Sequence, residues 1–333
     1  MIIKNHREYA KTTFLWLVCL VLVISIFAGN GYAQDNTSPI KVFVTIPPQK
    51  WLVERLVPDA VEVHLMVPPG KSPHVYEPTP RQMVDLAKAE LYLTVGASFE
   101  DAYIKRIART YPDLQIIDST KGINRRTMDE THDHEHGKPD DEDGQEHHGD
   151  HDHAAGHDEA HDEEENEDEH EDEHLDPHVW LSTDNLKIMA RNTASALGEI
   201  MPEKAEAIDE RLKNLIEEIN QVQERLSKQL KPYAGSRVYV FHPAFGYFTD
   251  AFKLRQRSVE IEGKAPTPRQ LNRLIKDARA AKVKILFVQP QFDQKSARAV
   301  ASAINGAVVR LDPLEPDVLS NLQKIADEIE EAL

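Results

Sequence analysis

Cysteine is almost missing from this chain, which has a single one, Cys19, among its 333 residues. It lies in an apolar run from 14 to 27 that follows several basic residues and precedes Gly31-Tyr32-Ala33, where small residues have the spacing of a signal-peptidase site. Residues 1–33 are therefore predicted to be a signal peptide cleaved near Ala33. Unless Cys19 is retained as a lipid anchor, the mature chain has no cysteine, which excludes disulfides, thiolate metal sites and cysteine nucleophiles.

Long apolar runs and basic patches are also missing. After residue 33 no stretch approaches the ~20 apolar residues of a membrane-spanning helix, so we expect a soluble exported protein, which suggests a periplasmic location. The net charge is −18, but 24 of the 57 acidic residues lie between Asp129 and Asp176, and the rest of the chain is close to neutral. No basic stripe remains that would indicate nucleic-acid binding.

Short runs rich in β-branched residues alternate with amphipathic stretches in both halves of the mature chain. In the first half this pattern predicts strands at 41–46, 61–66, 91–95 and 114–118, with helices at 49–56, 80–89 and 99–109. In the second half it predicts strands at 237–241, 258–261, 283–288 and 307–311, with helices at 244–253, 267–281, 293–304 and 316–332. Such alternation is typical of parallel sheets flanked by helices, so the predicted fold class is α/β, with two similar lobes.

A helical stretch joins the two halves. Thr183-Asp184 can cap one helix, and Pro202 can open a second one that reaches about Lys231. Apolar residues recur every three or four positions in the second helix, which gives one apolar stripe along roughly 40 Å. We therefore predict an N-terminal lobe at 34–182, a linker with a long rigid helix at 183–235, and a C-terminal lobe at 236–333.

The segment at about 127–174 differs from the rest in composition. It holds eleven histidines, nearly half of its residues are acidic, and it has almost no large apolar side chain. Such a segment cannot bury enough apolar surface to offset the entropy that it loses on ordering. A disordered loop is therefore predicted within the N-terminal lobe.

Three histidines outside this loop stand next to prolines: His74 after Pro73, His178 after Pro177 and His242 before Pro243. Each is expected at a strand end or at the start of a loop, where open α/β sheets place their ligands. Any one of them alone would be interpreted as a structural histidine or a helix cap, but three such settings favour a shared metal site. Neutral imidazole is the commonest side-chain ligand of zinc, and three imidazoles need only a carboxylate or a water to complete a tetrahedron.

Two carboxylates are candidates for supporting roles at such a site. Asp312 lies between the predicted strand 307–311 and Pro313, so it could be the fourth ligand, although a turn or helix-capping role stays open. Glu262 follows another predicted strand and could orient an imidazole from behind, while a cap or a salt bridge would explain it equally well.

The motifs around these residues resemble the zinc-specific solute-binding proteins of ATP-driven metal importers, the ZnuA-type group. The resemblance covers nearly the whole mature chain and is carried by Pro68-Pro69-Gly70, Pro73-His74-Val75-Tyr76-Glu77-Pro78, Asp176-Pro177-His178-Val179-Trp180, Phe241-His242-Pro243-Ala244-Phe245-Gly246-Tyr247, Glu260-Ile261-Glu262-Gly263-Lys264 and Leu311-Asp312-Pro313. It implies two lobes joined by a long helix, with one Zn²⁺ held in the cleft by His74, His178, His242 and Asp312. It also implies a monomer that is not an enzyme and that delivers the ion to an ABC permease with its ATPase.

The resemblance also bears on the choice of metal. A histidine at position 242 favours zinc, because manganese-binding relatives tend to carry a carboxylate at that step. Two features depart from the pattern: Pro73 stands where some zinc-binding relatives have a glutamate, and the mature chain cannot form the disulfide of others. The histidine-rich loop, as in some relatives, is expected to emerge near the cleft and to collect zinc weakly for the main site, the alternative being a dispensable solvated segment.

Three other functions are weighed against this one. They are a manganese or iron subunit of the same transporter class, a secreted metal-buffering or surface-adhesion protein, and a secreted metallohydrolase, since three histidines with an open position also describe catalytic zinc. Against a hydrolase, none of the predicted helices carries an HExxH motif, and there is no clear general base other than Glu262. Because imidazoles must be deprotonated to bind metal, affinity is expected to fall as the pH drops below about 6.5.

Overall fold

The computed structural model describes residues 39–128, 175–260, 267–292 and 294–333. The predicted signal peptide, nearly all of the histidine-rich segment, and Glu262 lie outside the described residues. From Ile40 to Leu333 the chain forms one compact unit. Within the part that the structure describes, no helix has both the length and the apolar character needed to cross a membrane.

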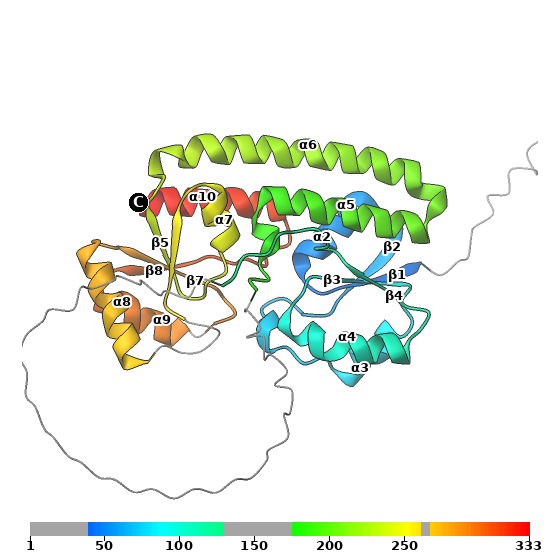
Figure 1. Cartoon of the computed structure of the whole chain (residues 1–333), viewed down its shortest axis with the longest axis horizontal. Coiled ribbons are helices and arrows are strands. Elements are labelled where there is room, and N and C mark those ends of the chain that lie inside the picture. Colours follow the sequence, from blue (N-terminus) through cyan, green and yellow to red (C-terminus); the bar gives the residue numbers. More distant parts are fainter. Residues whose placement is uncertain (1–38, 129–174, 261–266, 293) are drawn as a thin grey trace, which may run out of the picture. The chain divides into compact units, whose positions relative to one another are not determined.

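The first lobe is built on a four-stranded parallel sheet in the order β2-β1-β3-β4. Its strands are β1 (Ile40–Val44), β2 (Val61–Leu65), β3 (Leu91–Thr94) and β4 (Gln115–Asp118). On one face lies α2 (Pro47–Leu56), and on the other lie α3 (Pro80–Leu86) and α4 (Ser98–Thr110), as Figure 1 shows. Helices on both faces explain why β1 and β3 are almost wholly apolar rather than alternating.

The second lobe repeats this topology with the order β6-β5-β7-β8, again parallel. Its strands are β5 (Arg237–Val240), β6 (Arg255–Ser258), β7 (Ile285–Val288) and β8 (Ala307–Arg310), and its helices are α7 (Gly246–Ala251), α8 (Pro268–Ala280) and α9 (Gln294–Ala303). The predicted class, two similar α/β lobes with parallel sheets, is confirmed. The prediction of a strand at 258–261 was wrong, because β6 ends at Ser258 and pairs with β5 through Arg237 and Arg255.

Two helices lead from the first lobe to the second, and a third packs against them. α5 (Thr183–Ile200) packs along α6 (Ala205–Leu230), and α10 (Val318–Ala332) at the end of the chain also packs on α6 (Figure 1). The apolar stripe predicted for the long helix is buried, with Ile208, Leu215, Ile219, Val222, Leu226 and Leu230 in the core. The cap of α5 is Ser182 rather than Thr183-Asp184, because the Ser182 side chain accepts a hydrogen bond from Asn185 N.

The main hydrophobic core extends through both lobes. A single cluster of buried apolar side chains includes residues of both sheets together with α5, α6 and α10. A second, smaller cluster belongs to the outer part of the C-terminal lobe. The segments that follow β2 and β5, and the turn before α5, are thereby held on a shared scaffold, and these are the three places where the predicted histidines occur.

Candidate metal centre

His74 is presented from the loop that follows β2. Its backbone N–H donates to Ser72 Oγ (3.3 Å) at the start of a short 3-10 turn, Pro73–Val75. Gln82 ties the loop back to the end of the strand, since its Nε2 donates to Met66 O (2.6 Å). Fixed proline torsions and these hydrogen bonds hold the imidazole in one place.

His178 lies in the turn between the histidine-rich segment and α5. The Oδ1 atom of Asp176 accepts from the backbone N–H of His178 (2.9 Å) and lies 2.8 Å from its Nδ1. Trp180 Nε1 donates to Pro313 O (2.7 Å), which ties this turn to the segment after β8. His178 and Asp176 are 4% and 0% exposed, so the ring is oriented by a carboxylate that is shielded from bulk water.

His242 comes two residues after the end of β5. Its backbone N–H donates to Gln289 Oε1 (3.2 Å), and its Nδ1 lies 2.7 Å from Glu260 Oε2. The Phe292 ring stacks on the imidazole with a centroid distance of 4.4 Å and an interplanar angle of 20°. Backbone, carboxylate and aromatic contacts therefore fix both the position and the plane of this ring.

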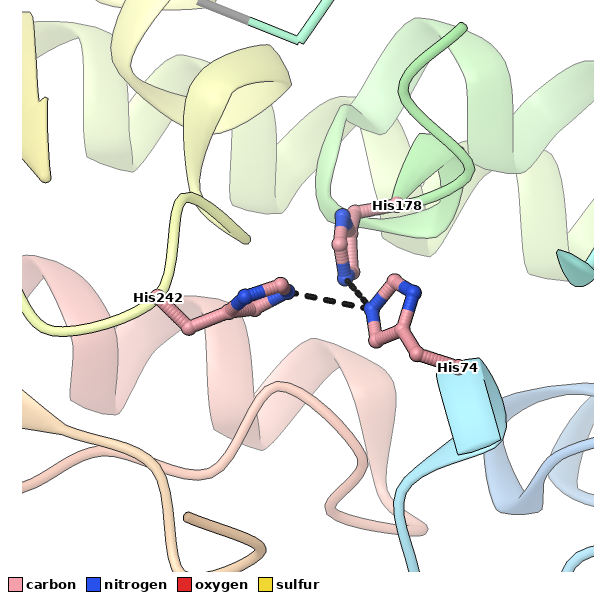
Figure 2. Close-up of side chains that lie close together, drawn as sticks. All are labelled: His74, His178 and His242. Atoms are coloured by element: carbon pink, nitrogen blue, oxygen red, sulfur yellow. Dashed lines mark hydrogen bonds between the residues drawn. The ribbon is translucent and has the colours of Figure 1, made fainter. Parts of the chain in front are cut away.

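The three imidazoles converge through their Nε2 atoms, as Figure 2 shows. His74 Nε2 lies 3.3 Å from His178 Nε2 and 3.0 Å from His242 Nε2, and one ring nitrogen of each histidine lies within 4.8 Å of the others. A tetrahedral zinc ion with bonds of ~2.0–2.1 Å would separate neighbouring nitrogens by about 3.3 Å. The observed spacing is therefore close to what a single small ion requires.

The carboxylates behind the rings decide which nitrogens carry protons. A carboxylate can only accept, so Asp176 and Glu260 place the proton on Nδ1 of His178 and His242 and leave a lone pair on each Nε2. A proton on Nε2 of His74 can point well at only one of these two lone pairs. Three nitrogens thus converge with too few protons to satisfy one another, and this is the chemistry of a cation site.

Burial keeps the rings of His74 and His242 neutral. The pKa of His74 is lowered to about 2, first by burial and then by the neighbouring His178 and His242. Burial also lowers the pKa of His242, against the opposing effect of the hydrogen bond to Glu260. At neutral pH both rings are therefore unprotonated, which is the form that binds metal.

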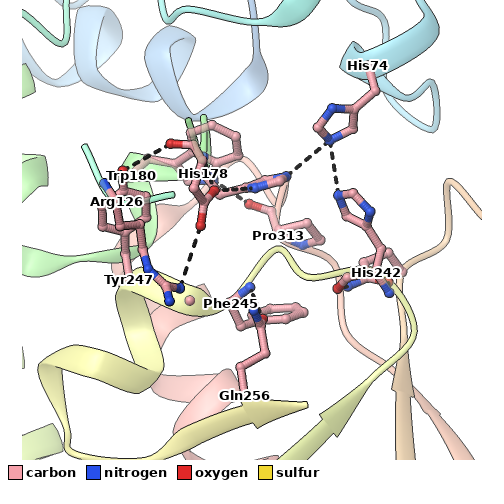
Figure 3. A network of polar contacts seen from close by, with 12 residues as sticks. His74, Arg126, His178, Trp180, His242, Phe245, Tyr247, Gln256 and Pro313 are labelled. Carbon is pink, nitrogen blue, oxygen red and sulfur yellow. Dashed lines mark hydrogen bonds and ion pairs between the residues drawn. The ribbon is translucent and has the colours of Figure 1, made fainter. Parts of the chain in front are cut away.

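Behind His178, an ion-pair network joins its turn to α7, which follows the third histidine (Figure 3). Arg126 Nη1 lies 3.7 Å from Asp176 Oδ2, and Arg126 Nε lies 3.2 Å from Asp250 Oδ2. Tyr247 OH accepts from Arg126 N (3.1 Å) and donates to Asp176 O (3.0 Å). A Cβ atom on Gly246 would overlap Nη1 of Arg126, so any larger residue at this position would displace that guanidinium group. We call these five residues the Arg126 clasp.

The structure brings the three predicted histidines together and places the predicted carboxylate differently. Among the described residues, the group of side chains able to share one ion consists of those three histidines. Asp312 Oδ1 accepts hydrogen bonds from Leu314 N (2.9 Å) and from Gln291 Nε2 (2.8 Å). A role for Asp312 as the fourth ligand therefore stays a prediction.

Asp176 and Glu260, the carboxylates that orient the rings, were not predicted from the sequence. Glu262, which was considered for that role, lies outside the described residues. Two signals could have found the actual pair. Asp176 stands two residues before His178, and Glu260 follows the strand that pairs with β5, so correct bounds for β6 would have placed it beside His242.

Comparison with known families gives the class of protein. A family profile described as zinc-uptake complex component A, periplasmic, matches residues 42–332. The chain belongs to this family. Its members are metal-binding, extracytoplasmic solute-binding components that work with the permease and ATPase of ABC transporters, and they are not enzymes.

Individual relatives match over most of the chain. A high-affinity zinc uptake system protein ZnuA from Haemophilus ducreyi is 31% identical over 303 residues, which cover 88% of this chain and 93% of the relative. A crystal structure of ZnuA has a TM-score of 0.73 and 29% identity, and the match covers 89% of this chain and 99% of that one.

The more distant structures with this fold include one that holds manganese. A mutant of a periplasmic metal-binding protein from candidatus liberibacter asiaticus, with Mn bound, has a TM-score of 0.67 at 19% identity, with 88% of this chain and 99% of that chain covered. The fold alone therefore does not determine which ion is bound, and the choice has to be argued from the ligands.

Proposed function

We propose that this protein captures Zn²⁺ with the neutral imidazoles of His74, His178 and His242 and passes it to the permease of an ABC importer. The observation that carries the proposal is the convergence of three Nε2 atoms, two of them backed by buried carboxylates. Three nitrogen ligands favour zinc, since manganese prefers oxygen-rich sites. Capture is a binding equilibrium in which the protein makes and breaks no covalent bond.

For the fourth position, the resemblance to the family offers Asp312. Its Oδ1 already accepts two hydrogen bonds, one from Leu314 N and one from Gln291 Nε2. To bind the ion directly, Asp312 would have to give up these contacts or use its other oxygen.

The proposed division of the chain assigns His74 to a lobe at 34–182 and His242 to a lobe at 236–333, joined by the linker at 183–235. The 26-residue helix α6 in this linker packs against α5 and α10, and such a packed helix resists bending. We therefore expect modest lobe movement on capture and release, concentrated in the loops that carry the ligands.

We assign the segment at 127–174 the role of collecting zinc ions for the main site. Its eleven histidines and many carboxylates offer weak sites that would raise the local zinc concentration near the main site. Its boundaries meet next to that site, because Thr127 and Leu175 form an antiparallel bridge and Asp176 N donates to Arg126 O (2.8 Å).

The experiment is a zinc titration of the metal-stripped mature protein in a competing chelator. In one variant His74, His178 and His242 are all replaced by alanine, and in the control His64, which lies on β2 outside the cluster, is replaced instead. We expect one tight site in the wild type and in His64→Ala, and only weak sites in the triple variant. Tight binding that survives the triple substitution would move the main zinc site elsewhere.

The same titration with Mn²⁺ addresses the alternative metal. The proposal expects manganese to bind far more weakly than zinc to the wild-type protein, because three imidazoles are a poor match for a hard ion. Equal or tighter manganese binding would keep the transporter class and overturn the assignment of zinc.

A further inference from the structure

A small cavity adjoins the three histidines. It encloses about 20 Å³, enough for one water-sized particle. Beside the imidazoles, its walls include Gln291 and Phe292 from the loop after β7, and Pro313 and Leu314 from the segment after β8. Asp312, which stands next to two of these residues in the chain, does not line the cavity.

Gln291 carries a side-chain oxygen at this place. Its Nε2 donates to Asp312 Oδ1 (2.8 Å), and because a carboxylate only accepts, this contact fixes which end of the amide is the NH₂ group. The oxygen Oε1 is then the end turned away from Asp312. It is shielded from solvent, and no hydrogen-bond donor of the described residues reaches it.

An amide oxygen buried in this way ordinarily has a partner. The other polar side chains of the cavity wall already have partners: Ser72 accepts from the backbone N–H of His74 (3.3 Å), and Trp180 Nε1 donates to Pro313 O (2.7 Å). Gln291 is therefore the residue of the wall whose buried oxygen is matched by no donor, and it shares that wall with three imidazoles that present lone pairs. A cation is the one partner that would satisfy all four groups together.

We propose that Gln291 Oε1, rather than Asp312, completes the coordination shell of the captured ion. The ligand set is then three imidazole nitrogens and one amide oxygen. Asp312 does not bind the ion in this assignment and acts as a positioning residue. Its Oδ1 accepts a hydrogen bond from the Gln291 amide and another from Leu314 N (2.9 Å), which fixes Asp312 in turn. This assignment rests on the proposed function, because it needs the three histidines to be ligands.

Two substitutions separate Gln291 from Asp312. Gln291→Met keeps the length of the side chain and removes the oxygen. Asp312→Asn keeps the acceptor that holds Gln291 and removes the charged ligand that the family resemblance would require. Gln323→Met on α10 makes the same chemical change as the first variant at a partly buried position away from the cavity, and so serves as its control.

The measurement is zinc affinity in a competing chelator, with thermal unfolding of each metal-free variant to check the fold. We expect Gln291→Met to weaken zinc binding about 10- to 100-fold, the range seen when a group supporting a metal site is removed. Asp312→Asn should stay within about threefold of the wild type, and Gln323→Met should not change affinity. A loss in Asp312→Asn that equals or exceeds the loss in Gln291→Met would overturn the assignment, as would wild-type affinity in Gln291→Met.

Cobalt substitution supplies a readout that general loosening of the fold would not mimic. The visible absorption of Co²⁺ reports the number and type of its ligands, so Gln291→Met should change the spectrum and Asp312→Asn should not. The triple histidine variant tests the proposed function separately from the role of Gln291. If it kept tight zinc binding, the proposed function would fail. If it lost zinc while Gln291→Met behaved as wild type, only the role of Gln291 would fail.

Discussion

At the scale of single residues, the site depends on hydrogen bonds made on the far side of each ring. Asp176 and Glu260 are buried carboxylates, 0% and 6% exposed, and each contacts an imidazole nitrogen that faces away from the centre. They fix the tautomer, raise the basicity of the metal-facing nitrogen, and bring negative charge near the ion without binding it. His74 is instead anchored through its backbone N–H, which donates to Ser72 Oγ, so its ring is held mainly by its loop and by burial.

The lowered pKa of His74 predicts how the metal-free protein responds to acid. Because the folded pKa, about 2, lies below the ordinary value of 6.5, the unfolded chain takes up the proton first as pH falls. The contribution of the neutral ring to stability is thus present above about pH 6.5 and is lost progressively below it, with a slope of up to about 1.4 kcal/mol per pH unit.

Urea unfolding of the metal-free protein at several values between pH 7.5 and 5 measures this slope. His74→Gln should flatten the pH dependence of the unfolding free energy, since glutamine does not titrate. His64→Gln is the matched control and should leave the slope nearly unchanged, because His64 lies on β2 outside the cluster of three histidines. Equal slopes in the wild type and in His74→Gln would show that His74 is not the group responsible.

At the scale of elements, the Arg126 clasp joins the turn before α5 to α7. We predict that Gly246→Ala lowers the free energy of unfolding by about 2–4 kcal/mol, because the new methyl group would displace Arg126 and leave the buried Asp176 poorly paired. Gly198→Ala on α5 is the control. A Cβ there meets nothing within 4 Å, and alanine favours a helix, so no loss is expected.

A double-mutant cycle identifies the cause of the loss. If Gly246→Ala acts by displacing Arg126, it should cost much less in a protein that already carries Arg126→Met. Purely additive losses in the double variant would mean that the methyl group disturbs something other than the clasp. Chemical denaturation of the four proteins gives the required free energies.

Elements with a strong apolar pattern were predictable from the sequence, and the strand that was misplaced lacks such a pattern. The central strands and the stripe of α6 bury apolar side chains, so hydrophobic periodicity located them. The edge strand β6 reads Arg-Gln-Arg-Ser and is defined by backbone pairing with β5, which leaves no apolar signature. Glu260 could not be assigned for the same reason, because its position beside His242 follows from the pairing of β6 with β5.

The site was predictable to the extent that local sequence constrains it. Proline beside each histidine marked three stiff loops, and the structure places the three side chains together. The bond between Gln291 and Asp312 joins two loops that are 21 residues apart, so no local pattern could reveal it. Composition indicated a segment without a core at 127–174, and nearly all of this segment lies outside the described residues.

At the scale of the whole molecule, the lobes share one main core. The cluster that contains β1 and β3 of the first lobe also contains β5, α6 and α10, so neither lobe keeps a complete apolar interior without the other. This arrangement differs from two domains on a flexible hinge, which would each carry a separate core. It predicts that the protein from residue 40 onward unfolds as one cooperative unit.

Ile219→Ala at the buried centre of α6 tests this prediction. Ile219 is 0% exposed and belongs to the shared core, so we expect a loss of about 2–5 kcal/mol in the free energy of unfolding. Gln221→Ala, two residues along on the exposed side of α6, should change it by less than about 0.5 kcal/mol. Far-UV circular dichroism follows both lobes, whereas the fluorescence of Trp51 and Trp180 follows α2 and the turn before α5. The two signals should shift together to lower urea in Ile219→Ala. A fluorescence transition that moved while a second circular-dichroism transition stayed in place would show that the C-terminal lobe keeps its own stability, and α6 would then be a connector rather than part of a common core.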